Sequence, residues 1–135
     1  MRPEFSDIER RLRQLEARIT TAPAATSDWV APTLLNSWAD YGGPEMLSGY
    51  CKDVSGFVHL RGLVKRGGSG IIRQVMFVLP AGFRPDKESN HAVVAFNKFA
   101  RLTVQANGEV YVESHDSPTP ESFVSLDGVT FDTRA

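Results

Sequence analysis

The sequence predicts a mainly β protein: an antiparallel β-sandwich or β-barrel head, preceded by a short N-terminal α-helical coiled coil, in a homotrimer. Two observations support this prediction. Near the start of the 135-residue chain, apolar residues recur at spacings of three and four, which is the repeat of a coiled-coil seam. From Trp29 onward, short apolar runs are separated by Gly, Pro and Asn, which is typical of antiparallel strands joined by turns.

Residues 4–20 are predicted to form the helix. Its a and d positions hold Phe5, Ile8, Leu12, Leu15 and Ile19. In this register Arg11, at g, can reach Glu16, at e, on a neighbouring helix. The segment 11–16 (RLRQLE) resembles the trimerisation motif of short parallel three-stranded coiled coils. The residues expected to hold the trimer together are Ile8, Arg11, Leu12, Leu15, Glu16 and Ile19. A short amphipathic helix packed on its own domain is the alternative.

The three parts of the chain are expected to be a trimerisation helix (1–20), a linker (21–28) and a β head (29–135). Residues 21–28 are small and polar and include Pro23, so they have neither helical nor strand periodicity. The strands expected in the head are 30–35, 46–51, 57–64, 71–79, 92–99, 101–105, 109–113 and 123–131.

Two hairpins are predicted within the head. A three-residue loop at 106–108 pairs Val104 with Val110 and Leu102 with Val112, so that all four apolar side chains share one face and Gly108 takes the left-handed conformation. A loop at 65–70 is expected to join strand 57–64 to strand 71–79, so that Val58, Leu60 and Val64 share a face with Ile71, Val75 and Phe77. His59, Arg61 and Leu63 would then point the other way.

Composition excludes several classes of protein. Fifteen Lys and Arg against sixteen Asp and Glu leave a net charge of −1, which favours neither nucleic-acid binding nor a polyanionic ligand. No apolar run is long enough for membrane insertion. A single cysteine, Cys51, excludes an intrachain disulfide and a multi-cysteine zinc site, and is consistent with synthesis in a reducing cytoplasm.

No catalytic, metal or cofactor site is expected. The three histidines, His59, His91 and His115, fall on different predicted segments and lack metal-binding spacing. Cys51 is interpreted as a small strand residue, because no histidine partner is placed beside it. The glycines of 67–70 lack the Gly-Lys-Ser/Thr ending of a phosphate-binding loop. The sequence therefore predicts a protein that is not an enzyme.

The head carries a set of motifs in order. They are Trp29 with 32–38 (PTLLNSW), 49–53 (GYCKD), 56–62 (GFVHLRG), 79–85 (LPAGFRP) and 126–131 (LDGVTF). As a set, these motifs resemble the C-terminal head domains of phage tail-fibre and baseplate receptor-binding proteins. Ser37 and Cys51 depart from the resemblance, since a glycine and an arginine are typical there.

The resemblance implies a homotrimeric component of the virion, on a tail fibre or baseplate of a phage or of a phage-tail-like particle. The implied partners are a bacterial surface polysaccharide or a teichoic-acid-like glycan, and other tail or baseplate proteins through the N-terminus. The alternatives are a structural trimeric virion protein without a ligand, such as a capsid decoration or fibre tip, and a carbohydrate-active enzyme.

A saccharide site needs an aromatic face and flanking polar groups. The residues expected to provide them are Trp38, Tyr41, Asp53, His59 and Arg61. Trp38 and Tyr41 lie beside a predicted loop, Asp53 precedes a tight turn, and His59 and Arg61 share one strand face. For Trp38, burial in the core is the structural alternative. Arg84, between Phe83 and Pro85, is interpreted mainly as a residue that holds a turn.

Overall fold

The computed structural model describes residues 7–12, 28–67, 70–115 and 123–134. Residues 7–12 are helical, within the predicted helix 4–20. On this segment Ile8 is 58% exposed and Leu12 is 56% exposed. Asp7 forms ion pairs with Arg10 at 2.7 Å and with Arg11 at 3.3 Å. The remaining predicted trimerisation residues, Leu15, Glu16 and Ile19, and the linker up to residue 27 lie outside the described residues.

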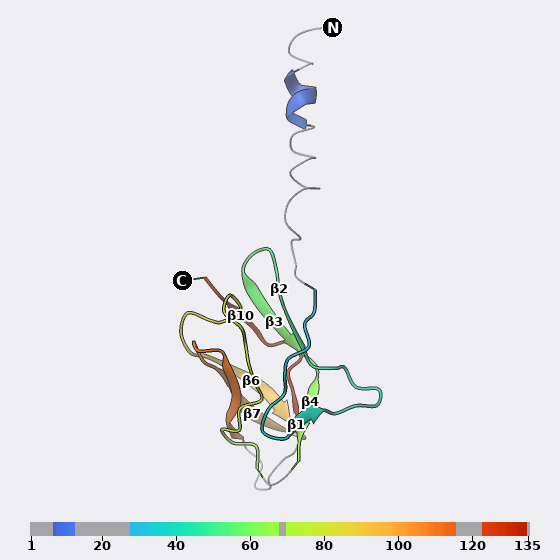
Figure 1. Cartoon of the computed structure of the whole chain (residues 1–135), viewed down its shortest axis with the longest axis vertical. Helices are drawn as coiled ribbons and strands as arrows, with labels where there is room; N and C mark the ends of the chain where they lie inside the picture. The colour runs from blue at the N-terminus through green and yellow to red at the C-terminus, as the bar shows by residue number, and fades with distance from the viewer. Residues whose placement is uncertain (1–6, 13–27, 68–69, 116–122, 135) are drawn as a thin grey trace.

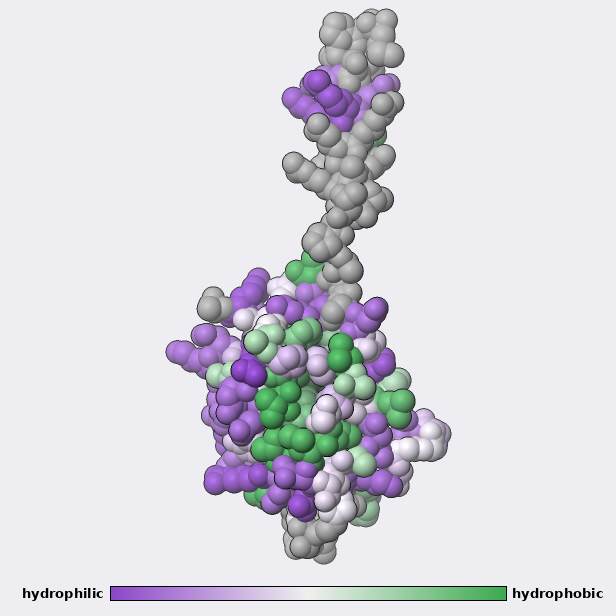
Figure 2. All heavy atoms as spheres, viewed as in Figure 1, coloured by the Kyte–Doolittle hydropathy of each residue, from purple (hydrophilic) through white to green (hydrophobic). Residues whose placement is uncertain are grey.

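The head is built from antiparallel strands, as predicted. Within the described residues these strands are β1 (Trp38–Asp40), β2 (Gly49–Lys52), β3 (Phe57–Arg61), β4 (Leu63–Arg66), β5 (Phe77–Val78), β6 (Ser89–Ala95), β7 (Lys98–Val104), β8 (Glu109–His115), β9 (Phe123–Ser125) and β10 (Thr130–Asp132). A seven-stranded sheet has the order β1-β4-β9-β6-β7-β8-β5, and a three-stranded sheet has the order β10-β3-β2. Figure 1 shows the three-stranded sheet at the end of the head where the C-terminus lies. In the same view, Figure 2 shows hydrophobic residues gathered on the middle of the visible face of the head, with hydrophilic residues around them.

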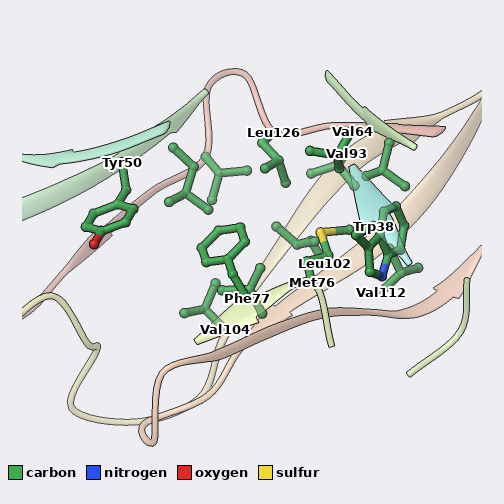
Figure 3. Close-up of a cluster of buried hydrophobic side chains, with 14 of the residues drawn as sticks. Trp38, Tyr50, Val64, Met76, Phe77, Val93, Leu102, Val104, Val112 and Leu126 are labelled. Carbon is green, nitrogen blue, oxygen red and sulfur yellow. The ribbon is translucent and has the colours of Figure 1, made fainter. Parts of the chain in front are cut away.

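Both sheets contribute to one core. In Figure 3 the core runs from Tyr50, on the three-stranded sheet, past Phe77 and Leu102 to Trp38, on the edge strand β1 of the seven-stranded sheet. Phe77 is 1% exposed, Leu102 is fully buried, and Tyr50 stacks on Phe77 with ring centroids 6.5 Å apart. The shared core means that the two sheets form one head.

The first predicted hairpin is confirmed in its register. Val104 pairs with Val110 and Leu102 pairs with Val112, and all four side chains are fully buried. Gly108 has a φ of +94°, and a Cβ there would lie 2.4 Å from the carbonyl oxygen of Leu79. Glycine is therefore required at position 108, both by the conformation of the turn and by the close approach of the Leu79 backbone.

The second predicted hairpin is wrong, because the apolar stretch 57–64 is two strands rather than one. Gly62 separates them with a φ of +107°, so β3 pairs with β2 and β10 whereas β4 pairs with β1 and β9. A Cβ on Gly62 would lie 2.5 Å from the Cα of Ser48. This glycine carries the chain from one sheet into the other.

Other strand boundaries also differ from the prediction. Residues 92–99 and 101–105 were expected as separate strands, but the turn falls at 96–97, between β6 and β7. Region 30–35 contributes only the isolated bridge from Val30 to Tyr50 among the described residues. Region 71–79 forms only the short strand β5 and a bridge at Ile72. Region 123–131 is divided into β9 and β10.

Candidate functional site

Three of the five residues predicted to bind saccharide lie on or beside the three-stranded sheet. His59 and Arg61 occupy alternate positions of β3 and share the face opposite to the buried Val58 and Leu60, as the period of two predicts. Asp53 follows β2 directly. The structure therefore brings Asp53 and His59 into contact and leaves Arg61 one step farther along the same strand face.

Trp38 is a core residue, which corrects its prediction as a sugar-stacking aromatic. It is 4% exposed, and its indole Nε1–H donates a hydrogen bond of 2.9 Å to the carbonyl of Gln74. A buried ring has no free face for a ligand. Its apolar area stabilises the fold instead, and its polar atom is satisfied by the backbone.

Tyr41 is exposed and lies beside an aromatic pair on the other sheet. Its side chain is 42% exposed, its ring meets Phe123 edge-on at 5.6 Å, and the Lys65 ammonium lies 5.5 Å from its ring centroid. Phe96 extends the cluster, with its centroid 5.3 Å from that of Phe123. Tyr41 thus has an accessible ring, although its contacts are separate from those of His59 and Asp53.

Asp53 is held by the β2–β3 turn. Its Oδ1 accepts hydrogen bonds from the backbone N–H of Ser55 at 2.9 Å and of Phe57 at 3.0 Å. Gly56 closes the turn with a φ of +93°. Aspartate is favoured at such a position because its short side chain can satisfy the backbone two residues onward. One carboxylate oxygen is therefore structural, and the other is directed to His59.

His59 bridges Asp53 and Thr130. Its Nε2 lies 2.8 Å from Asp53 Oδ2, and its Nδ1 lies 3.0 Å from Thr130 Oγ1. The ionised carboxylate can only accept, so Nε2 carries the donated proton. The hydrogen bond from His59, then those from the backbone N–H groups of Phe57 and Ser55, hold the pKa of Asp53 below its ordinary value of 3.8. The imidazole is thereby oriented on an open strand face.

Arg61 packs against the ring of Trp29. The guanidinium carbon lies 4.1 Å from the ring centroid, a cation–π geometry. Gly49 lies opposite Arg61 in the β2–β3 ladder, and a Cβ there would come within 3.3 Å of Arg61 Nε and 3.4 Å of Trp29. Glycine therefore makes room for the two side chains. Among the described residues, the buried Arg61 Nε has no hydrogen-bond partner.

Trp29 and Arg61 line a small hollow of about 150 Å³. The residues that line it are Trp29, Val30, Ala31, Asp40, Leu47, Ser48, Gly49 and Arg61. Trp29 remains 41% exposed and Leu47 remains 59% exposed. Asp40 accepts a hydrogen bond of 2.7 Å from the backbone N–H of Ser48 through Oδ1. The hollow thus combines an open aromatic ring, a cation and a carboxylate, the groups that recognise a sugar ring and its hydroxyls.

Sequence reasoning missed Trp29 as a member of this site. Trp29 precedes the isolated bridge from Val30 to Tyr50, and that pairing of distant segments brings its ring over Arg61. A pairing between segments so distant in sequence cannot be predicted from a local pattern of residues. The available signal was the position of Trp29 at the start of the head, directly after a small and polar segment.

The other candidate chemical groups have structural roles. Burial raises the pKa of the Cys51 thiol, which is 3% exposed, so the thiolate is disfavoured. Arg84 Nε donates to the carbonyl of Leu79 at 2.8 Å, which confirms that this arginine holds a turn. Burial lowers the pKa of His91, whose Nε2 lies 2.8 Å from Ser89 Oγ.

Two absences are recorded for the described part of the chain. Its histidine, cysteine and acidic side chains form no group of three or more that could hold a metal ion. None of its helical segments is both long and apolar enough to span a bilayer.

Comparison with known proteins gives one informative match. No family model matches the chain, and no curated protein sequence matches it. The crystal structure of the receptor binding protein (gp15) of Listeria phage PSA superposes with a TM-score of 0.74, over 100% of this chain and 82% of that one, at 15% sequence identity. The chain therefore has the fold of a phage receptor binding protein.

Proposed function

We propose that the chain is a host-attachment protein of a phage or of a phage-tail-like particle, carried on the virion as a tail-fibre or baseplate component. The observation that supports this function most is the similarity of fold to a phage receptor binding protein over the whole chain. The helix 7–12, with Ile8 and Leu12 exposed, supports a homotrimer joined by the N-terminal segment. Other tail or baseplate proteins are proposed to receive that segment.

The proposed ligand is saccharide on the bacterial surface. The hollow between Trp29 and Arg61 supports this ligand, because an exposed indole offers a surface for the C–H face of a sugar while Arg61 and Asp40 offer a donor and an acceptor for its hydroxyls. His59 and Asp53 extend the polar surface along the same face of β3. Three copies in a trimer would raise the avidity of weak single sites.

The site is tested by binding of the labelled full-length protein to purified cell walls from a panel of bacterial strains. Arg61→Ala and Trp29→Ala are each expected to weaken binding at least tenfold, because each removes one wall of the hollow. His59→Ala and Tyr41→Ala test the two flanking surfaces. Lys98→Ala is the control, since it removes a positive charge from an exposed position of β7. Undiminished binding by all four site variants would refute the proposed site.

The trimer is tested by size-exclusion chromatography with light scattering. Wild type is expected at about 45 kDa, three times the chain mass of 14.9 kDa. The double variant Ile8→Asp/Leu12→Asp is expected to elute as a monomer, because it places charges in the apolar seam. Arg10→Ala, at the outward f position, should leave the mass unchanged. A monomeric wild type at micromolar concentration would exclude the trimer.

Hydrolysis is the second candidate function, favoured by the contacts of His59. The order Asp53 carboxylate, imidazole, Thr130 hydroxyl is that of a catalytic triad. The discriminating assay is release of acetate or reducing sugar from the same cell walls. Attachment without chemistry predicts no turnover and the same binding by Thr130→Ala as by wild type. Turnover that Thr130→Ala abolishes would establish the enzyme instead.

A further inference from the structure

A second hollowed surface lies on the seven-stranded sheet, across the outer faces of β6, β7 and β8. One hollow, of about 360 Å³, is lined by Asn90, His91, Ala92, Phe99, Ala100, Arg101 and Ser114. A second, of about 490 Å³, is lined by Arg73, Val75, Glu88, Arg101, Glu109, Tyr111 and Glu113. Because Arg101 lines both hollows, they lie next to each other on the outer face of the sheet. We call this surface the Arg101 groove.

One end of the Arg101 groove is apolar. Phe99 is 68% exposed, and it lies opposite Val94, which is 46% exposed, in the β6–β7 ladder. At this exposure Phe99 contributes little to the stability of the fold, because most of its apolar area remains in water. An open phenyl ring at the rim of a polar hollow is suited to the C–H face of a sugar.

The middle of the groove carries an amide whose orientation is fixed. Arg101 Nε donates to Asn90 Oδ1 at 2.9 Å, and Thr103 Oγ1 donates to the same oxygen at 2.8 Å. Thr103 is fully buried, and an arginine Nε can only donate, so the amide oxygen must face these two groups. The Asn90 Nδ2 has no hydrogen-bond partner among the described residues and is a fixed donor on the groove surface.

The other end of the groove is polar and also held in place. Gln105 Nε2 donates to Tyr111 Oη at 2.7 Å and to Glu88 at 3.1 Å. Arg73 holds Glu113 with two hydrogen bonds to Oε1, from Nη2 at 2.6 Å and from Nε at 3.2 Å. Groups that are already ordered lose little conformational entropy when a ligand binds.

The charges of the Arg101 groove select against a polyanion. Three carboxylates, those of Glu88, Glu109 and Glu113, stand beside the two guanidinium groups of Arg73 and Arg101. A chain of phosphates or uronates would meet the carboxylates, whereas hydroxyl groups can donate to carboxylates and accept from guanidinium groups. The groove is therefore matched to an uncharged, hydroxyl-rich chain.

We propose that the Arg101 groove is a second saccharide site, which binds an extended neutral oligosaccharide with one sugar stacked on Phe99. The site stands on its own geometry, and its biological role rests on the proposed function in attachment. It shares no lining residue with the hollow formed by Trp29 and Arg61. The protein would then contact the same surface polymer at two points on each head.

The experiment is an array of neutral and anionic bacterial oligosaccharides, probed with the full-length protein and four variants. Wild type is expected to bind neutral glycans that Phe99→Ala and Arg101→Ala bind at least tenfold more weakly. Arg101→Lys keeps the charge but loses the Nε donor that orients Asn90, so it should also bind more weakly. Lys98→Ala is the matched control and should retain these glycans, because it removes a positive charge from an exposed position of β7 that lines neither hollow. Thermal unfolding of Phe99→Ala should equal that of wild type, since Phe99 is exposed.

Three outcomes would overturn the proposal. They are an array on which wild type binds no neutral glycan, equal binding by wild type and Phe99→Ala, and a loss of binding by Phe99→Ala together with a change of oligomeric state. The last outcome would assign the groove to contact with a second copy of the chain. If the protein binds the neutral glycans but not the cell walls, the proposed function in attachment is refuted, whereas the saccharide site in the Arg101 groove is supported.

Discussion

At the scale of single residues, positive backbone φ values mark where the chain is under local strain. Asn36 and Ser37, with φ of +54° and +68°, form the turn that leads into β1, closed by the hydrogen bond of 2.9 Å from Trp38 N–H to the Leu35 carbonyl. Ser37 is also the position where the resemblance led us to expect glycine. The structure explains that expectation, because glycine adopts a positive φ without steric cost.

Ser37→Gly is therefore expected to stabilise the head by about 1 kcal/mol. The substitution relieves the left-handed conformation of a residue with a side chain. Chemical denaturation of the full chain measures the effect. Ser37→Ala is the matched control: it removes the same hydroxyl but keeps the Cβ, so it should give no gain. An equal gain in both variants would show that the hydroxyl, and not the backbone, is responsible.

At the scale of elements, the hairpins show which turns can be predicted from the sequence. The β7–β8 register could be predicted because Asn107 and Gly108 mark the loop and the alternation of valines and Leu102 allows one apolar face. The β6–β7 turn could not be predicted, since its first residue is Phe96 with a φ of +57°, a conformation that normally calls for glycine. Contacts of Phe96 with Phe123 hold this unmarked turn in place.

The candidate site likewise contains residues that a local sequence pattern predicts and residues that it does not predict. His59 and Arg61 were predictable as a pair because they alternate with the buried Val58 and Leu60 on one strand. The contact of Arg61 with Trp29 depends on a bridge between segments distant in sequence, so no local period contains it. Trp38 was misassigned because an aromatic residue beside a loop has the same local pattern whether its ring faces the core or the solvent.

Gly62→Ala is expected to destabilise the protein by about 2 kcal/mol or more. The φ of +107° disfavours a side chain, and the added Cβ would meet the backbone of Leu47 and Ser48 at 2.6 and 2.5 Å. Thermal unfolding measures the loss. Gly67→Ala, where no described heavy atom lies within 4 Å of the added Cβ, should change little. A small effect at Gly62 would mean that the two strands tolerate a shift.

At the scale of the whole molecule, half-buried carboxylates on separate parts of the head respond to acid in the same direction. Hydrogen bonds from Arg134 lower the pKa of Asp132 to about 2, Arg73 lowers the pKa of Glu113, and His59 lowers that of Asp53. In each case the folded state binds the proton less readily than the unfolded state. Their contribution to stability is therefore complete above the unfolded pKa and is lost as the pH falls through the folded one.

The midpoint of thermal unfolding should accordingly fall as the pH is lowered from 5 toward about 2. Asp132→Asn should flatten the lower part of this dependence, because the ordinary pKa of 3.8 is shifted to about 2 in the folded protein. Calorimetry at a series of pH values measures both curves. A wild-type midpoint that is constant over this range would contradict the role of these carboxylates.

Under the proposed function in attachment, the bridge between Val30 and Tyr50 has a mechanical consequence. Two backbone hydrogen bonds, of 2.8 and 3.0 Å, tie Val30 to the edge strand β2. A pulling force transmitted from the N-terminal side reaches the head first at this point, beside Trp29 and Arg61. A force applied from the N-terminal side would thus strain the wall of the hollow itself. The lifetime of a bound glycan under load should therefore depend on the direction in which the protein is pulled.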